Sequence, residues 1–391
     1  MVEEMSSDAL PNLLADFVRI GSIAEWWNYS PSFSEQKLPL LDLRPSKDYY
    51  RCYIRGSVNI PISEVKQRSY ELPPREKAFA VLAPDENDIN TVSIIRDFFL
   101  YIDQRKRAQK PWNIPMVLFA SNHLNWEQAE QLGILEQKST SVDTEDDDDD
   151  DGNCSLVNQK KPLPRLWQPD TMVRELLLPL LVQTLSTDHD HRDGQEEIER
   201  CNEIWDLGAG AGRDVCFLAE ELKANESITN KNYCVVGMDQ RYRDLASEEC
   251  LKFWERRQVG TVTRCVSVQL DNSNNTTPEH HRELFQKEVQ NGHHRRVACF
   301  YAVRFWNQSL FEFISKESLI ESGTIVAVSQ FAKPYAGAPW NFEHPKEKNV
   351  LDYDQLSRLF SSEMGWKILH DDIVQDSDHG RTLIQFVAQK A

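Results

Sequence analysis

Residues 203–214 (EIWDLGAGAGRD) place glycines between two carboxylates in one short turn. An apolar stretch ends at Asp206, and Asp214 opens a segment with helical spacing. Glycine lets the backbone approach a ligand where a Cβ atom would collide, although a tight structural turn is the alternative. The pyrophosphate of a dinucleotide gains nothing from flanking carboxylates. A cofactor with ammonium and sulfonium groups does gain, so the turn favours S-adenosyl-L-methionine over NAD or ATP.

A further carboxylate follows one strand–helix unit later. The apolar run 233–238 ends at Asp239, which can accept hydrogen bonds from both hydroxyl groups of a ribose. An ordinary surface acid at a strand end is the alternative. A third predicted strand, 262–270, leads to Asp271, and either Gln269 or Asp271 could contact the adenine amine.

These residues require a sheet to position them. Apolar strands alternate with amphipathic helices through residues 162–391, an order typical of a mostly parallel, doubly wound α/β sheet. Such sheets bind ligands at the carboxyl ends of their strands. We therefore expect the cofactor near the ends of the strands at 203–207 and 233–238.

The same region resembles class I S-adenosylmethionine-dependent methyltransferases. The turn WDLGAGAGRD and the tail beginning GTIVAVSQFAKPYAGAPWNF are similar to the branch with tellurite-resistance-type enzymes. The resemblance implies a Rossmann-like, seven-stranded domain, with 187–200 and 272–294 as inserted polar loops. It also implies that the last strand, 382–388, inserts antiparallel beside the strand near 324–329.

The turn, the strand ends and the resemblance together define a set of predicted cofactor-binding residues. The segment RLWQPDTMVRELLLPLL also resembles the one that precedes such domains in bacterial-type fusions, where its tryptophan would lie over the cofactor. A core anchor is an equally good interpretation of that tryptophan. The predicted cofactor-binding residues are Asp206, Gly208, Ala209, Gly210, Gly212, Asp239, Gln240, Asp271 and Trp167.

The methyl acceptor is less clearly indicated. The fourth predicted strand, 296–301, is followed by Arg304 and lacks the Asn/Asp-Pro-Pro-aromatic turn of amino-methylating enzymes. Arg304 favours a small acceptor with a soft or anionic nucleophile, such as a chalcogen oxyanion, thiol or carboxylate, and a salt-bridged surface arginine is the alternative. Two other functions stay open: a protein or RNA methyltransferase with an N-terminal adaptor, and a cofactor-binding regulatory or scaffold protein without turnover.

The length of the chain limits the number of its domains, and its charge indicates its partners and its linker. Its 391 residues predict two or three domains, and its net charge of −18 disfavours nucleic acid because phosphates would be repelled. Six consecutive aspartates, 146–151, predict a disordered acidic linker over 137–161. The linker separates a domain at 1–136 from a domain at 162–391.

The N-terminal part predicts a small α/β domain with a parallel sheet. Short apolar runs near 38–43, 57–60, 79–82 and 116–119 are candidate strands, and 91–102 has helical spacing. The segment LLDLRPSKDYYRCYIRGSVNIP resembles the rhodanese-like domain, which implies a sulfurtransferase fold and a surface for a protein partner. Sulfur transfer requires a cysteine in the loop after the central strand. That loop is APDEND, and no cysteine lies between Cys52 and Cys154, so we expect no catalysis here.

Cysteine usage and hydropathy indicate the compartment. The 8 cysteines form no CxxC pair, so no structural zinc site and no other metal is expected. Several cysteines lie in apolar runs, as buried thiols in a reducing compartment do. The acidic N-terminus is unlike a signal peptide, and no apolar run approaches the length of a membrane span. We expect a cytoplasmic protein without membrane attachment.

Overall fold

The computed structural model divides the chain into two compact units, unit 1 (residues 1–159 and 163–168) and unit 2 (160–162 and 169–391). Residues 163–168 were predicted to belong to the second domain but group with unit 1, where Leu166 joins the core. The aspartate run lies outside the described residues. The residues that the structure describes are 14, 18–29, 37–100, 111–137, 163–187, 200–228, 232–240, 245–270, 278–290, 295–333, 347–375 and 381–391.

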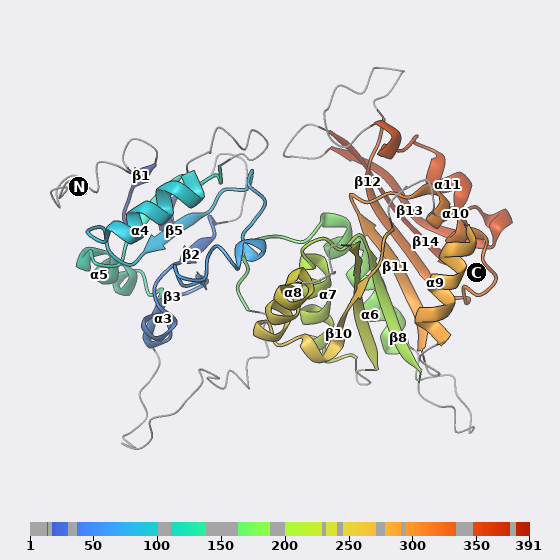
Figure 1. Ribbon diagram of the computed structural model, residues 1–391, viewed down its shortest axis with the longest axis horizontal. Helices are drawn as coiled ribbons and strands as arrows, with labels where there is room; N and C mark the ends of the chain where they lie inside the picture. Colours follow the sequence, from blue (N-terminus) through green and yellow to red (C-terminus); the bar gives the residue numbers. More distant parts are fainter. Residues whose placement is uncertain are drawn as a thin grey trace, which may run out of the picture. The chain divides into compact units, whose positions relative to one another are not determined.

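Unit 1 contains a five-stranded sheet in the order β1–β6–β5–β2–β4 (Figure 1). All neighbouring strands in this sheet are parallel, as the alternation of strands and helices predicted. Its strands are β1 (Arg19–Ile20), β2 (Leu40–Asp42), β4 (Val58–Asn59), β5 (Ala80–Ala83) and β6 (Met116–Phe119). A separate antiparallel pair joins β3 (Cys52–Ile54) to β7 (Leu135–Gln137).

Short helices connect these strands. They are α2 (Ile23–Asn28), α3 (Ser46–Arg51), α4 (Ile89–Ile94) and α5 (His123–Gln131), and a π-helical turn, Ile95–Leu100, extends α4. The side chain of Asp88 caps α4 by accepting the N–H groups of Asn90 and Thr91. The four residues of β5 are all buried, which suits its position in the middle of the sheet.

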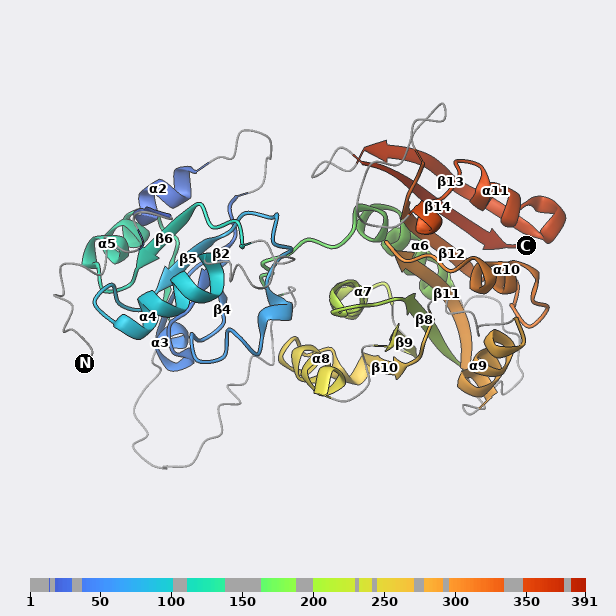
Figure 2. The same ribbon diagram turned by 45° about the horizontal axis from the view of Figure 1, so that its top comes forward.

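Unit 2 contains a seven-stranded sheet in the order β10–β9–β8–β11–β12–β14–β13 (Figure 2). β14 is antiparallel to both of its neighbours, and the other neighbouring pairs are parallel. The strands are β8 (Cys201–Leu207), β9 (Tyr233–Asp239), β10 (Thr263–Ser267), β11 (Arg295–Val303), β12 (Ile325–Phe331), β13 (Trp366–Gln375) and β14 (Thr382–Lys390).

Helices cover both faces of this sheet. A π-helical turn, Met172–Leu177, leads into α6 (Leu178–Thr187), which lies on the same face as α7 (Arg213–Ala224) and α8 (Leu245–Arg256) (Figure 2). The opposite face carries α9 (Pro278–Gln290), α10 (Gln308–Lys316) and α11 (Gln355–Leu359). The interpretation of 272–294 as a polar loop was therefore wrong. α9 buries Phe285 against Trp205, and its mostly polar residues concealed the helical spacing.

The position of β14 confirms the predicted antiparallel insertion. β14 pairs with β12, where Val326 faces Ala388, and with β13 on its other side. Ile384 and Val387 lie on opposite faces of the strand and both are fully buried, so both faces of β14 are covered. Large aromatic side chains from strands and helices complete this core and fix the strands whose carboxyl ends carry the candidate site.

Candidate functional site

The glycine turn after β8 has a backbone that favours glycine at three positions. The φ angles are 84° at Gly208, 56° at Gly210 and 67° at Gly212, in the region where a Cβ atom causes strain. The N–H groups of Gly208 and Ala209 both donate to the carbonyl oxygen of Met238, at 2.9 and 3.1 Å. These bonds fix the turn to the end of β9.

The three glycines have different surroundings. A Cβ atom on Gly208 would lie 2.6 Å from Phe305, and one on Gly212 would lie 2.8 Å from Trp254. For Gly210 the nearest atom would be the carbonyl oxygen of Gly208, at 4.0 Å. Two glycines are therefore required by packing, whereas the third leaves space in which the backbone can approach a ligand.

Asp239 lies at the glycine turn, which confirms the predicted proximity of the two. The Gly210 N–H donates to Asp239 Oδ2 at 2.9 Å. β8 and β9 are parallel neighbours, so their carboxyl ends bring both residues to one edge of the sheet. The bond holds a carboxylate beside the open space at Gly210.

Asp206 adds a buried carboxyl group at the end of β8. Its side chain is only 3% exposed, and its partner on β11, Tyr301, is fully buried. Burial raises the pKa of Asp206 well above its usual value, and the charges of Asp214 and Asp239 raise it further. A cation near this group would favour its ionised form.

Asp214 stands in the first turn of α7 and is joined to the segment before α6. Its Oδ1 accepts the backbone N–H of Asp170 at 3.1 Å. Burial and the negative charge of Asp170 raise the pKa of Asp214 to about 7, while Arg213 and Arg304 oppose the shift. Asp206, Asp214 and Asp239 therefore place three carboxyl groups around the glycine turn.

Asp170 and Arg304 are linked through Ser329. The carboxylate of Asp170 accepts the Met172 N–H at 2.9 Å and the Ser329 hydroxyl at 3.2 Å. The carbonyl of Ser329 in turn accepts the Arg304 N–H at 2.7 Å. Arg304 has a φ of 55°, and its guanidinium carbon lies 5.7 Å from the ring centre of Phe331. A non-glycine residue in this conformation is strained by about 1–3 kcal/mol, and such strain concentrates at functional sites.

The structure unites most of the predicted cofactor residues. Gln240 directly follows Asp239 and is exposed at the same strand end. Trp167 is 4% exposed and groups with unit 1, so its role over a cofactor stays a prediction. Asp271 lies outside the described residues. The predicted residues gathered at the turn are Asp206, Gly208, Ala209, Gly210, Gly212 and Asp239.

Asp170 and Ser329 are site residues that the sequence analysis missed. Each lies far along the chain from the glycine turn, on an element that only the folded sheet brings close. A proline–aspartate pair just before a helical segment does indicate a helix start at Asp170. Nothing in that pattern indicates which part of the sheet the helix start would approach.

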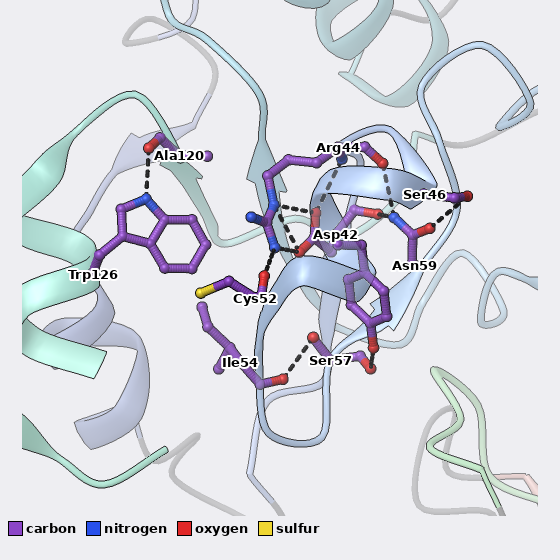
Figure 3. A network of polar contacts seen from close by, with 10 residues as sticks. Asp42, Arg44, Ser46, Cys52, Ile54, Ser57, Asn59, Ala120 and Trp126 are labelled. Carbon is purple, nitrogen blue, oxygen red and sulfur yellow. Dashed lines mark hydrogen bonds and ion pairs between the residues drawn. The ribbon is translucent and has the colours of Figure 1, made fainter. Parts of the chain in front are cut away.

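Unit 1 has its own buried polar network at the ends of β2 and β4 (Figure 3). Arg44 is paired with Asp42 at 2.7 Å, donates to the carbonyl of Cys52 at 2.8 Å, and lies over the ring of Trp126 at 4.5 Å. Asn59 donates to the carbonyl groups of Asp42 and Arg44. Arg44 and Asn59 therefore connect the end of β2 to β3 and to β4.

In the loop after β5 and the start of α4, carboxylates of the loop accept several backbone N–H groups. Asp85 accepts the N–H of Asn87 at 3.0 Å, and Asp88 accepts the N–H groups of Asn90 and Thr91. These amides are directed at carboxylates of the loop itself. The loop also lacks a cysteine.

Within the described ranges, no group of three or more His, Cys, Asp and Glu side chains could hold a metal ion. In the same part of the chain, no helix combines the length and apolar character that crossing a membrane requires.

No family model and no curated protein matches the chain. Among solved structures, the cyclase SpnF has a TM-score of 0.33 at 11% identity, over 49% of this chain and 76% of that chain. A 16S rRNA adenine-N1 methyltransferase from Catenulisporales acidiphilia, with cosubstrate SAM, has 0.31 at 12% identity, over 49% and 85%. The 1,6-didemethyltoxoflavin-N1-methyltransferase from Burkholderia thailandensis, with bound S-adenosylhomocysteine, has 0.30 at 14%, over 49% and 72%. At such low TM-scores these likenesses carry no argument about function.

Proposed function

We propose that unit 2 is an S-adenosyl-L-methionine-dependent methyltransferase domain. The observation that carries the proposal is the hydrogen bond from Gly210 to Asp239, which holds a carboxylate beside an open glycine turn. Asp239 would accept the ribose hydroxyl groups of the cofactor. Asp206 and Asp214 would supply negative charge for its ammonium and sulfonium groups.

The same charges argue against a dinucleotide. A pyrophosphate normally binds at a helix N-terminus, where backbone N–H groups and the helix dipole attract it. Here the first turn of α7 carries Asp214, with Asp170 beside it and Asp206 at the end of β8. A phosphate at this position would be repelled by the ionised forms of these groups, whereas a cation would favour those forms.

The chemistry of the site is alignment rather than covalent catalysis. When bound, the cofactor supplies a methyl group, which bonds to the acceptor's lone pair as the carbon–sulfur bond breaks and its electrons stay on sulfur. The fixed turn and Asp239 would hold the donor in line with the acceptor. Arg304, exposed at the end of β11, would orient an anionic acceptor.

We place the acceptor among small molecules with a soft or anionic nucleophile, such as a chalcogen oxyanion, thiol or carboxylate. The support is Arg304, whose strained backbone is held by Ser329 at the edge of the site. Methylation of a protein or an RNA, or cofactor binding without turnover, would leave the cofactor site unchanged. Metabolite profiles of cells with and without the protein would distinguish these functions. Cells without the protein should lack a methylated metabolite only if the protein methylates a small molecule.

For unit 1 we propose a rhodanese-like domain that lacks sulfurtransferase activity and provides a surface for binding a protein partner. Its five-stranded parallel sheet and the loop after the central strand β5 support the proposal. The tellurite-resistance-like type of unit 2 rests on sequence resemblance alone.

Titration calorimetry with the full-length chain tests the cofactor. We expect saturable binding of S-adenosyl-L-methionine and S-adenosyl-L-homocysteine, and none of NAD, because the site lacks a place for a pyrophosphate. Binding of NAD with no heat from either sulfur compound would contradict the proposal.

The variant Asp239→Asn tests the residue that carries the proposal. The amide still offers an oxygen to the Gly210 N–H, so the turn should persist. Loss of the charge should weaken cofactor binding by about 1.5–3 kcal/mol, the usual range for hydrogen bonds to charged groups. Asp372→Asn is the matched control, since Asp372 is 71% exposed on the edge strand β13. Equal affinities of the two variants would contradict the role of Asp239.

A further inference from the structure

The site contains more carboxyl groups than binding of a ribose explains. The carboxyl group of Asp206 interacts electrostatically with those of Asp214 and Asp239, and Asp214 interacts with Asp170. Asp170 and Asp214 are also joined directly, since the Asp170 N–H donates to Asp214 Oδ1 at 3.1 Å. We call these four residues the carboxylate cluster. Carboxylates that interact in this way ionise together only at a cost in free energy, and a bound cation lowers that cost.

The covalent structure of the cofactor indicates which members lie near its sulfur. The sulfur is bonded to the ribose through one carbon atom, so a ribose at Asp239 places the sulfur close by. In that arrangement the amino-acid part would extend from β9 towards the end of β8 and the start of α7. On that side lie Asp206, at the end of β8, and Asp214, at the start of α7.

We propose that Asp214, held in place by Asp170, makes the site selective for the sulfonium cofactor over its uncharged-sulfur product, S-adenosyl-L-homocysteine, and that the cluster releases a proton when the cofactor binds. The inference rests on the proposed function and adds a selectivity residue to it. Donor and product share the ribose, the adenine and the charges of the amino-acid part. They differ in the methyl group and in the positive charge on sulfur. A charged side chain such as an ionised carboxylate interacts with that charge more strongly than a neutral one does.

The geometry supports a role in which Asp214 changes charge. Its Oδ1 is fixed by the Asp170 N–H, and Asp170 is fixed by Met172 and Ser329, so the pair cannot separate to relieve repulsion. The free cluster therefore retains a proton near neutral pH, in agreement with a pKa of about 7 for Asp214. A bound sulfonium lowers that pKa and expels the proton.

The charged and titratable groups around Asp214 come from several elements. Arg213 and Arg304 stabilise its ionised form, and the other carboxyl groups oppose it. Tyr301 stays protonated, because burial raises its pKa well above the usual value. Besides its own four members, the groups that face the cluster are Arg213, Cys299, Tyr301 and Arg304.

The same charge change should favour release of the product. Methyl transfer removes the positive charge from sulfur, so the ionised cluster loses its counter-charge at the moment the product forms. The cluster then takes up a proton again. We expect the product to be held less tightly than the donor, and increasingly so as pH rises.

The experiment is calorimetry of the full-length chain with S-adenosyl-L-methionine and with S-adenosyl-L-homocysteine at about pH 6 and about pH 8. The ratio of the product's Kd to the donor's Kd should rise roughly tenfold over this range, as expected when one proton of pKa near 7 is linked to binding. In Asp214→Asn the ratio should be small and independent of pH. Asp239→Asn should weaken both ligands and keep the pH dependence, and Asp372→Asn should behave as the wild type.

The outcomes separate this inference from the proposed function. Failure of both ligands to bind the wild type would overturn the proposed function itself. Binding of both with a ratio that does not change with pH, or a pH-dependent ratio that survives in Asp214→Asn, would overturn the inference alone. If Asp214→Asn does not fold, donor titrations of the wild type in buffers of different ionisation enthalpy decide. At about pH 6, where a group with a pKa of about 7 is still mostly protonated, proton release close to one per site supports the inference, and no release contradicts it.

Discussion

Asp206 is a buried carboxyl group whose contribution to stability depends on pH. Its pKa is raised by burial, so the folded state holds its proton more tightly than the unfolded state, whose Asp pKa is about 3.9. The free energy of unfolding should therefore fall as pH rises above that value. We predict that Asp206→Asn raises Tm at about pH 8 more than at about pH 5, and weakens S-adenosyl-L-methionine binding.

Thermal unfolding followed by circular dichroism measures this effect, with Asp372→Asn as the control. Asp372 is exposed, so its replacement should change Tm little at either pH. A Tm for Asp206→Asn below that of the wild type at both pH values would show that Asp206 stabilises the fold.

The residues of the site differ in how far the sequence could predict them. Asp206, the glycines and Asp239 follow strands whose apolar runs are recognisable, and parallel strands must bring their carboxyl ends to one edge. Asp170 and Ser329 could not be predicted in this way. Their proximity depends on where the segment before α6 packs against β12, and that packing is a tertiary property.

The glycine turn is the element in which packing and binding can be separated by substitution. Gly208→Ala would force its Cβ atom against Phe305, whereas Gly210→Ala meets open space. Both have a positive φ, which costs about 1–2 kcal/mol for a residue with a Cβ atom. We predict that Gly208→Ala loses clearly more unfolding free energy than Gly210→Ala, and that Gly210→Ala mainly weakens cofactor binding.

Urea unfolding and calorimetry of the two variants test this prediction. The comparison carries its own control, because the two substitutions have the same chemistry and a similar backbone strain. Equal losses of stability would mean that Phe305 moves aside without cost. Unimpaired cofactor binding by a folded Gly210→Ala would mean that no ligand approaches the turn there.

At the same scale, the elements that the sequence predicted are those with strong local patterns. β14 was recognisable because its continuous apolar residues require burial on both faces, and the structure covers both. β1 is two residues long and is formed only by pairing with β6, so no local pattern could indicate it. α9 was missed because its few apolar residues are separated by charged ones.

At the scale of the whole molecule, the two units share an architecture and differ in what their loops carry. Each has parallel strands whose carboxyl ends meet at one edge, as α/β sheets generally do. In unit 2 that edge holds a glycine turn and the carboxylate cluster. In unit 1, aspartates of the loop after the central strand accept the N–H groups of Asn87 and Asn90. Fold similarity alone therefore assigns neither unit a function.

From the loop after β5 in unit 1, we predict that the full-length chain has no thiosulfate sulfurtransferase activity. A persulfide requires a reactive thiolate, with its pKa lowered and backbone amides converging on it. The loop 84–88 has no cysteine, and Cys52, the sole cysteine among residues 1–136, lies in β3, where burial raises the pKa of its thiol. Cyanide-dependent thiocyanate formation should stay at the rate without protein, and Cys52→Ser should not change it. Turnover that disappears in Cys52→Ser while Tm is unchanged would show that β3, not the loop after β5, carries a thiol site.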